Sequence, residues 1–369
     1  MKKLNASQIK VDQALAWDVY DAQGHLLLRK GFVVQNDTQL ESLLERGMYV
    51  SNADWEAIEK SKRDPEPVNV FNPFWLWDDI LSKVTYVLKF AATVDMFEDK
   101  ITGIAFLLLN LTDNDPDAAL GSILLKDASR YAYCHSLHVA VLTAIVSKRM
   151  GWSDEQRRDV VRAALSMNVA MIELQTMLLH QQDPLTDQQR IEVNQHPQKG
   201  YEMLREKGVV SPAWLDAVRL HHEKVPLKAD AVSNPDGQGM SQLIRVLDVF
   251  GAKVSPRTYR RAMQPPVAAK EIFVQEREVC AEFVDVLIKE IGLYMPGTFV
   301  KLENGETALV IKRGANVNSP KVVSLSRGDG MPYIDGPKRD TAKPEFAVKN
   351  VVPKEKIMHM LNLSKLWGY

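Results

Sequence analysis

Apolar residues recur at helical spacing from about residue 76 to residue 290, and this feature most restricts how the chain can fold. Helix-start patterns stand inside that stretch. Two are capping boxes, in which a hydroxyl and a glutamine satisfy each other's backbone N–H groups, and one is an N-cap followed by proline. They are Ser153 with Gln156, Thr186 with Gln189, and Ser211-Pro212. The spacing predicts a mainly α fold whose helices pack on one another.

The N-terminal residues predict a small α+β module over residues 1–55. Residues 8–34 alternate weakly between apolar and polar side chains, and the stretch DAQG at residues 21–24 is typical of a hairpin connection. Residues 36–47 predict a short helix with a capping residue before it and a glycine at its end. A charged, proline-rich stretch follows, and we expect it to be a linker over residues 56–75.

Strand-like alternation replaces helical spacing after Gly292. Asn304-Gly305 stands between two alternating runs, which is the strongest short-range hairpin pattern in the chain. The remaining residues keep the glycine, proline and valine content of a small β unit. We therefore expect a helical domain at residues 76–290 and a β-rich C-terminal extension at residues 291–369.

Charge and cysteine content narrow the classes of function. Lys+Arg 46 against Asp+Glu 47 gives a net charge of −1, which argues against a chain that binds DNA or RNA over its whole surface. Cys134 and Cys280 lie far apart and suit a reducing compartment better than a disulfide scaffold. The first residues lack the apolar core of a signal peptide, and the longest apolar run, residues 103–111, is about half a membrane span. We expect a cytoplasmic protein that does not enter a membrane.

Polar residues within the helical region form a candidate metal site. Asp248 shares one helix face with Leu247 and Gly251, so its carboxylate should be desolvated, which is costly unless it is paired or bound to a cation. His222 follows Val218 by four residues and should lie on a buried face. Imidazoles and a carboxylate are a normal ligand set for Fe, Mn or Zn. The candidates are His135, His196, His221, His222 and Asp248, and the alternative for each histidine is a satisfied packing residue.

Motif order and spacing over roughly residues 115–290 resemble the HD-GYP branch of the HD phosphohydrolases. The most specific stretches are HPQKGYEML at residues 196–204 and DVFGAKVSPRTYR at residues 248–260. The resemblance implies an HD-type helical bundle core, flanked by the small N-terminal α+β module and the small C-terminal β unit. Active members of the family hydrolyse cyclic di-GMP at a centre of two or three metal ions, where a metal-bridging hydroxide attacks the phosphodiester.

The resemblance implies that part of the metal site is retained. His135 falls on the family's first ligand histidine, His196 on its His-Pro step, and His221-His222 on its paired histidines. Asp248 falls on the final ligand aspartate. Arg257 and Arg260 fall on basic residues that commonly hold the ligand's phosphates, with surface solvation as the alternative. Tyr259, between them, either packs or stacks on a guanine.

The resemblance also implies that other site residues are lost. Tyr131 stands where an acidic ligand is expected, and Met167-Asn168 stand where the His-Asp pair of the family belongs. Met171 replaces a phosphate-facing lysine. The Asp-Gly-x-Gly-Tyr-Pro turn should begin at residue 226, where the chain reads PLKADA, and we expect DGQG at residues 236–239 to be a plain turn. Because an amide cannot bridge two divalent cations as a carboxylate does, the remaining ligands should hold one ion at most.

We therefore expect a degenerate, catalytically inactive HD-GYP-like signalling protein that acts as a cyclic di-GMP receptor or as a scaffold for a partner protein. One alternative is a weak metal-dependent phosphodiesterase that uses a single Fe, Mn or Zn ion. A third hypothesis makes the helical domain a platform and gives recognition to the flanking modules. The sequence leaves open whether any metal is bound and whether the chain forms a homodimer.

Overall fold

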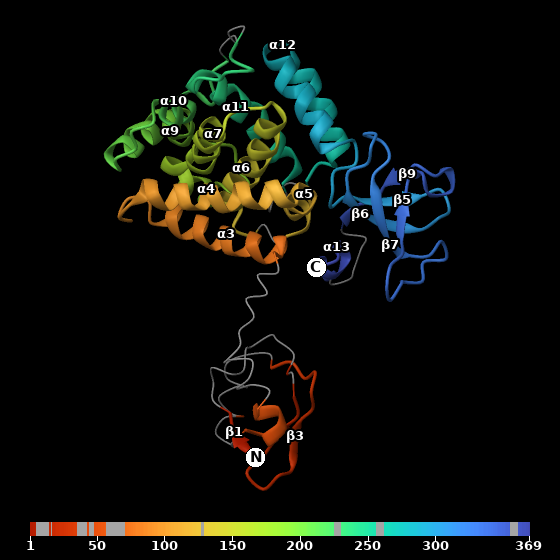
Figure 1. Cartoon of the computed structure of the whole chain (residues 1–369). Helices are drawn as coiled ribbons and strands as arrows, with labels where there is room; N and C mark the ends of the chain where they lie inside the picture. Colours follow the sequence, from red (N-terminus) through yellow and green to blue (C-terminus); the bar gives the residue numbers. More distant parts are fainter. Residues whose placement is uncertain are drawn as a thin grey trace. The chain divides into compact units, whose positions relative to one another are not determined.

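The computed structural model divides the chain into two compact units, Met1–Phe71 and Asn72–Tyr369 (Figure 1). The residues it describes are 1–4, 15, 17–34, 43, 48–56, 71–126, 129–224, 230–255, 262–354 and 361–369. Apart from Leu43, the helix expected at residues 36–47 lies outside them. The second unit contains both the helical region and the C-terminal β region, and the predicted division at residues 55, 75 and 290 stays a prediction.

The first unit contains a small antiparallel sheet with the strand order β1-β4-β2-β3. The strands are β1 (Lys2–Lys3), β2 (Val19–Tyr20), β3 (Leu26–Leu28) and β4 (Tyr49–Val50). The hairpin predicted at residues 21–24 is confirmed, because β2 and β3 pair on either side of it. Gly24 takes φ 89°, and Asp21 accepts hydrogen bonds from the backbone N–H groups of Gln23 and His25. Hydrogen bonds within residues 21–25 therefore close the turn between β2 and β3.

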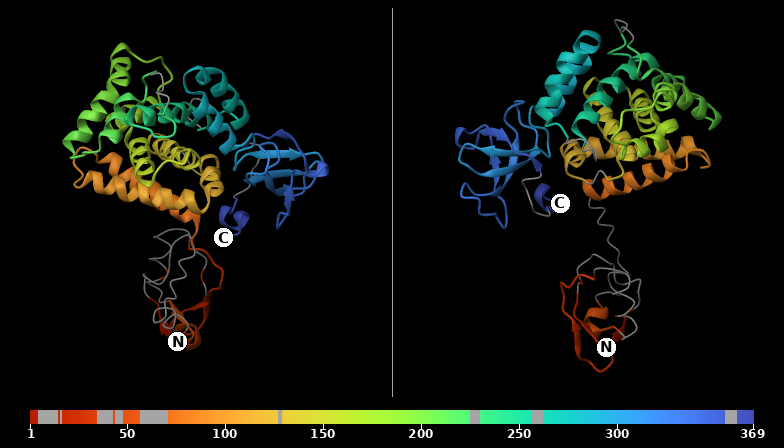
Figure 2. Two further views of the ribbon diagram at one scale, coloured as in Figure 1. Left: turned by 45° about the horizontal axis from the view of Figure 1, so that its top comes forward. Right: turned by 180° about the vertical axis from the view of Figure 1, so that it is seen from behind.

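The second unit is mainly α-helical, as predicted, and Figures 1 and 2 show α3 and α4 side by side along one side of the bundle. The helices are α3 (Pro73–Lys89), α4 (Phe97–Asn114), α5 (Pro116–Leu125), α6 (Tyr131–Arg149), α7 (Asp154–Ser166), α8 (Ile172–Leu178), α9 (Asp187–Glu206), α10 (Pro212–Leu220), α11 (Gly237–Val254) and α12 (Pro265–Ile291), with a 3-10 turn η2 at Val169–Met171. Helix α6 is buried along nearly its whole length, so it forms the centre of the core. In the part of the chain that is described, no helix could cross a membrane.

The predicted helix starts are confirmed. Both capping boxes are closed in both directions, at Ser153 and at Thr186. The Ser211 side chain accepts a hydrogen bond from the backbone of Trp214, with proline at the first helical position. These ends could be predicted because a cap is satisfied by residues within three positions of it.

The prediction of a plain turn at residues 236–239 is wrong. Asp236 is the N-cap of α11, and its carboxylate accepts the backbone N–H of Gly239 at 2.9 Å. A Cβ on Gly237 would lie 2.5 Å from the Asp216 side chain, and one on Gly239 would lie 2.8 Å from the Ala231 carbonyl. The glycines therefore allow the first turn of α11 to pack tightly against its neighbours.

Two tryptophans, Trp75 and Trp77, lie in the first turns of α3. Trp77 is buried, and its ring lies 5.8 Å from that of His138. Trp75 is 68% exposed. Residue Pro73, which was expected in the linker, is the first residue of α3.

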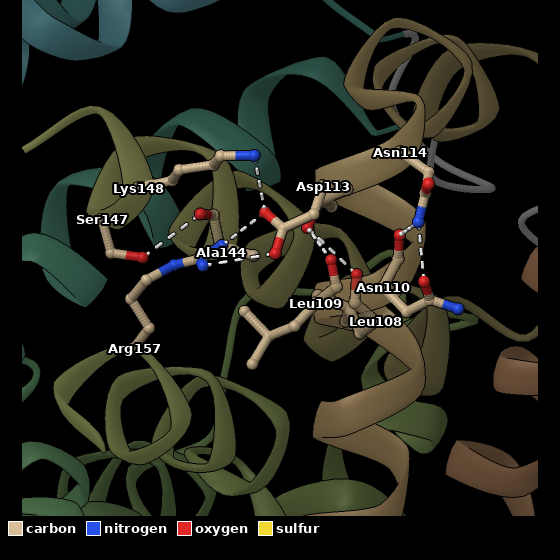
Figure 3. A network of polar contacts seen from close by, with 10 residues as sticks. Leu108, Leu109, Asn110, Asp113, Asn114, Ala144, Ser147, Lys148 and Arg157 are labelled. Atoms are coloured by element: carbon tan, nitrogen blue, oxygen red, sulfur yellow. Dashed lines mark hydrogen bonds and ion pairs between the residues drawn. The ribbon is translucent and has the colours of Figure 1, made fainter. Parts of the chain in front are cut away.

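Asp113 joins three helices of the bundle (Figure 3). Its carboxylate, on α4, accepts a hydrogen bond from the Arg157 guanidinium on α7 at 2.7 Å and lies 3.0 Å from Lys148 Nζ on α6. Burial by itself would raise the pKa of Asp113, but these two cations lower it. The interaction fixes the ends of α4 and α6 relative to the start of α7.

A five-stranded antiparallel sheet follows the helices, with the strand order β8-β7-β6-β5-β9. The strands are β5 (Phe299–Leu302), β6 (Thr307–Lys312), β7 (Lys321–Ser326), β8 (Lys338–Asp340) and β9 (Val348–Val351), with a 3-10 turn η3 at Pro344–Phe346 and a last helix α13 at Leu363–Trp367. The predicted Asn304-Gly305 hairpin is confirmed by the pairing of β5 with β6. Arg313 connects the sheet to the helices, because its guanidinium binds Asp117 at 2.6 Å and Glu290 at 2.9 Å.

Glu306 is the polar centre of this sheet. Its buried carboxylate accepts hydrogen bonds from Ser324, Tyr333 and Arg339 at distances of 2.5 to 3.1 Å. Burial by itself would raise the pKa of Glu306, but these hydrogen bonds lower it to about 2. The carboxylate is therefore ionised across the ordinary pH range and holds three strand segments together.

We expect Glu306→Gln to lower the free energy of unfolding at pH 7 by roughly 2 kcal/mol, because Arg339 loses its charged partner. Since the folded pKa of about 2 lies below the ordinary value of 4.5, this stabilisation is present above pH 4.5 and is lost as the pH falls towards 2. Urea unfolding at several pH values measures both effects. The control is Glu303→Gln, whose exposed carboxylate lies 3.9 Å from Lys349, and we expect a change within about 0.5 kcal/mol. Equal effects of the two variants would contradict the prediction.

Candidate metal and ligand site

Four helices bring the five predicted ligand residues to one place in the bundle. His135 comes from α6, His196 from α9 and Asp248 from α11, while His221 and His222 follow the end of α10. One ring nitrogen from each of His196, His221 and His222 lies within 4.8 Å of the other two. His135 and Asp248 form a second group, with His135 Nε2 2.6 Å from Asp248 Oδ1.

Packing of α9 against α10 sets the distance between two of these imidazoles. Gly200 lies on the contact face of α9, and a Cβ there would be 3.3 Å from the Val218 side chain of α10. The absence of that Cβ lets the two helices approach closely. His196 Nε2 and His221 Nε2 consequently lie 3.1 Å apart.

Backbone carbonyls set the tautomers of both rings. Pro197 has no N–H to donate to the carbonyl of Val193, so this oxygen is free and accepts His196 Nδ1–H at 2.5 Å. The carbonyl of Val218, in the last turn of α10, likewise accepts His221 Nδ1–H at 2.6 Å. Each ring therefore keeps its proton on Nδ1 and presents the lone pair of Nε2 to the other ring.

This arrangement fits a metal ion. Two nitrogens bound to one ion at about 2.1 Å, with an angle of about 90–100° between them, would be about 3.0–3.2 Å apart. The observed 3.1 Å lies in that range. His222 adds a third imidazole, because its ring centroid lies 5.0 Å from that of His196 and 4.2 Å from that of His221.

Burial keeps the inner imidazoles neutral, as metal ligands must be. Desolvation lowers the pKa of His196 to about 4 and that of His221 to about 3, although the carbonyl hydrogen bonds act in the opposite direction. Burial also lowers the pKa of His138, which hydrogen-bonds Ser255, to about 3. His138, His196 and His221 are therefore bases that do not take up protons at neutral pH.

Asp248 is held by a protein partner. Its side chain is 16% exposed, and burial by itself would raise its pKa. The hydrogen bond from His135, together with the neighbouring imidazoles, lowers that pKa below its ordinary value. The carboxylate expected to be paired or bound to a cation is thus already paired with His135 Nε2.

The residues predicted to have replaced family ligands surround this pair. Tyr131 stacks on the His135 ring, with centroids 5.5 Å apart and an angle of 14° between planes. Asn168 and Met171 line the same cavity as His135 and Asp248, whereas Met167 is fully buried in the core. A phenol, an amide and a thioether therefore stand around the retained histidines.

One prediction about the histidines is wrong. His222 was expected on a buried face, four residues after Val218, but it is exposed, and His221 is the fully buried member of the pair. Helix α10 ends at Leu220, so helical spacing no longer places residue 222. His222 lines the cavity instead. The predicted phosphate-binding residues Arg257, Tyr259 and Arg260 lie outside the described residues.

The ligand residues open onto a cavity of about 560 Å³, within the roughly 300–1,000 Å³ of small-molecule sites. One wall is formed by α8 and the connection that follows it, residues 178–185. Sequence reasoning missed this wall. It contains Gln175, Leu178 and Leu179, and a short helix followed by a connection gives no periodic pattern from which a cavity wall could be predicted.

Comparisons with known proteins agree on one family. Residues 122–278 match the family model described as HD domain. The chain is 26% identical over 249 residues to a cyclic di-GMP phosphodiesterase of Pseudomonas aeruginosa, a match that covers 63% of this chain and 59% of that relative. It is 27% identical over 178 residues to the cyclic di-GMP phosphodiesterase response regulator RpfG of Xanthomonas campestris, covering 46% and 45% of the two chains. The chain therefore spans less than two thirds of the length of either relative.

A search of solved structures finds a HDG"Y"P protein of Bdellovibrio bacteriovorus. The TM-score is 0.48 and the sequence identity 13%, and the match covers 78% of this chain and 97% of that chain.

We expect the stability of metal-free protein to fall as the pH decreases from about 6.5 to about 4, because the buried imidazoles stay neutral while those of the unfolded chain take up protons. In His221→Asn the amide can still donate to the Val218 carbonyl but does not titrate. The slope of unfolding free energy against pH should therefore be smaller by about 1.4 kcal/mol per pH unit between pH 4 and 6. Denaturant unfolding with a chelator measures the slope. His180→Asn, at an exposed position, is the control, and identical slopes in all three proteins would refute the assignment.

Proposed function

Because the chain is an HD-GYP-type family member, we propose that it is a catalytically inactive signalling protein that binds cyclic di-GMP or a partner protein without cleaving the dinucleotide. Its curated relatives are cyclic di-GMP phosphodiesterases, which supports this dinucleotide as the ligand. Cys134 and Cys280 are both buried, which suits a reducing compartment, and we propose that the protein lies in the cytoplasm.

The direct hydrogen bond between His135 and Asp248 carries the proposal. In the family resemblance these two residues are the first and last metal ligands, but here they bind each other at 2.6 Å. A metal at their position would have to break a charge-assisted hydrogen bond in a nearly buried place, which is costly. The pair is therefore a protein substitute for one metal ion.

The neighbouring side chains do not favour a second ion. Asn168 lines the cavity where the resemblance places a bridging carboxylate, and a neutral amide oxygen binds a divalent cation weakly. Tyr131, in the position of a further acid, is packed on the His135 ring. Hydrolysis by a bridging hydroxide needs two metal ions held close together, so the residues present support binding more than cleavage.

The three imidazoles of His196, His221 and His222 fit a single divalent ion. When bound, such an ion would supply positive charge for a phosphate group. The chain's own part is to hold the two inner rings in one tautomer and to keep them neutral. This cluster is also the observation that favours the second candidate function, a weak one-metal phosphodiesterase acting on cyclic di-GMP or a related nucleotide.

We expect purified protein supplied with Mn²⁺ or Fe²⁺ to bind cyclic di-GMP and to cleave it no faster than about tenfold above a protein-free blank. The reason is the missing bridging carboxylate at Asn168. Calorimetric titration measures binding, and chromatography of the nucleotides measures cleavage. His222→Ala separates the chain's own activity from contamination, because only the former would depend on this imidazole. Cleavage at an enzyme's rate that is abolished in His222→Ala would refute inactivity and support the second candidate.

We expect at most one Fe, Mn or Zn ion per chain after saturation and gel filtration, measured by elemental analysis. His222→Ala should lower the metal affinity at least tenfold, because it removes one of three imidazoles from an exposed position where the fold tolerates the change. The matched control is His180→Ala, which changes an exposed histidine outside the cluster. Two ions per chain would mean that the His135–Asp248 pair opens to bind metal.

A further inference from the structure

The cavity has two chemically different halves. One half carries His135, His196, His222 and Asp248. The other half consists of α8 and residues 178–185, with the apolar side chains Leu178, Leu179 and Leu185, several glutamines and the exposed Asp183. A ligand that fills this space should have an anionic group at one end and a flat or apolar group with a polar edge at the other.

Gln175 differs from the other glutamines of this wall. Gln181 is fully committed, because its amide exchanges two hydrogen bonds with Gln189 at 2.7 and 3.0 Å. Gln182 is exposed at the rim. Gln175 lines the cavity, and its buried Oε1 finds no donor among the described residues.

An amide oxygen buried without a donor destabilises the protein, because it has given up its hydrogen bonds to water without replacing them. The last torsion of a glutamine side chain has a broad energy profile, so an amide with no fixed partner can turn towards a ligand. Gln175 is therefore the polar side chain of this wall that gains most from a bound molecule.

A nucleotide has the two-ended chemistry of the cavity. Its phosphate is attracted to the imidazoles and to any cation that they hold. The base would then lie in the α8 half of the cavity. The faces of a base suit the leucine side chains, and its edge offers neighbouring donors and acceptors that an amide can meet in pairs.

We propose that the α8 half of the cavity is a base subsite in which Gln175 hydrogen-bonds the edge of a guanine, while the phosphate lies on the histidine side. This inference rests on the proposed function, because it assumes that cyclic di-GMP enters the cavity. It assigns to a glutamine outside the candidate metal site the role of a specificity-determining residue.

Two substitutions of Gln175 test the subsite, with affinities for cyclic di-GMP and cyclic di-AMP measured by calorimetry. Gln175→Leu removes the polar edge and should weaken the binding of cyclic di-GMP about tenfold or more. Gln175→Glu replaces an amide that donates and accepts by a carboxylate that only accepts. Guanine N1–H can donate to it, but adenine N1 cannot, so the ratio of the two affinities should shift at least tenfold towards cyclic di-GMP.

The control is Gln275→Leu, the same change at an exposed position of α12 outside the cavity, which should leave both affinities within about twofold of the wild type. Wild-type affinities and an unchanged ratio in the Gln175 variants would overturn the subsite and leave the receptor function standing. Equal weakening of both dinucleotides by Gln175→Glu, with no change in ratio, would also overturn it, because a structural role predicts that result. Failure of the wild type to bind either dinucleotide would overturn the subsite and the receptor function together.

Discussion

Two lone pairs that face each other inside the bundle set the main constraint on this structure. His196 Nε2 and His221 Nε2 lie 3.1 Å apart, and each ring has already given its proton to a backbone carbonyl. Two acceptors at this distance repel each other unless a proton or a cation lies between them. Burial opposes a proton, because it lowers the pKa of both imidazoles. The two imidazoles are held in this arrangement by Pro197 in α9, by the end of α10 and by the close helix contact at Gly200. A cation is therefore the partner that best satisfies their two lone pairs.

Asp248 has the opposite requirement, because its carboxylate is an anion that is mostly shielded from solvent, and another side chain meets this requirement. A nearly buried carboxylate needs positive charge or hydrogen-bond donors, and His135 Nε2 meets Asp248 from α6 at 2.6 Å. One carboxylate oxygen is thereby committed to His135. The five candidate ligand residues therefore form two groups: a pair joined by a direct hydrogen bond, and a cluster of three imidazoles.

Local patterns in the sequence predict local structure in this chain. The capping boxes at Ser153 and Thr186 and the hairpin at Asn304-Gly305 are present, because each is completed within a few residues. Helical spacing likewise predicts the mainly α fold. The error at His222 arises where that spacing ends, since α10 stops at Leu220 and the buried ring is that of His221.

The site itself could be predicted only in part. The resemblance names its histidines and Asp248, and the structure brings them together, but no pattern predicts which of them bind each other. The His135–Asp248 hydrogen bond joins residues 113 positions apart, and its geometry depends on how α6 packs against α11. The orphaned oxygen of Gln175 is equally a product of packing. The proposed function and the proposed subsite rest on these two features, and both appear only when the helices are assembled.

Charge explains how the proposed receptor could bind a nucleotide without cleaving it. A divalent ion held by imidazoles alone would keep its full double charge, because no carboxylate among its ligands would cancel any of it. In the low dielectric of the cavity this charge attracts a phosphodiester more strongly than a carboxylate-rich centre would. Activation of water for hydrolysis requires a second ion and a carboxylate that bridges the two ions. The family resemblance places that carboxylate where Asn168 stands. In the proposed receptor, an amide at Asn168 would therefore leave the attraction for the anionic end of the ligand in place, while the wall around Gln175 would be available for the base.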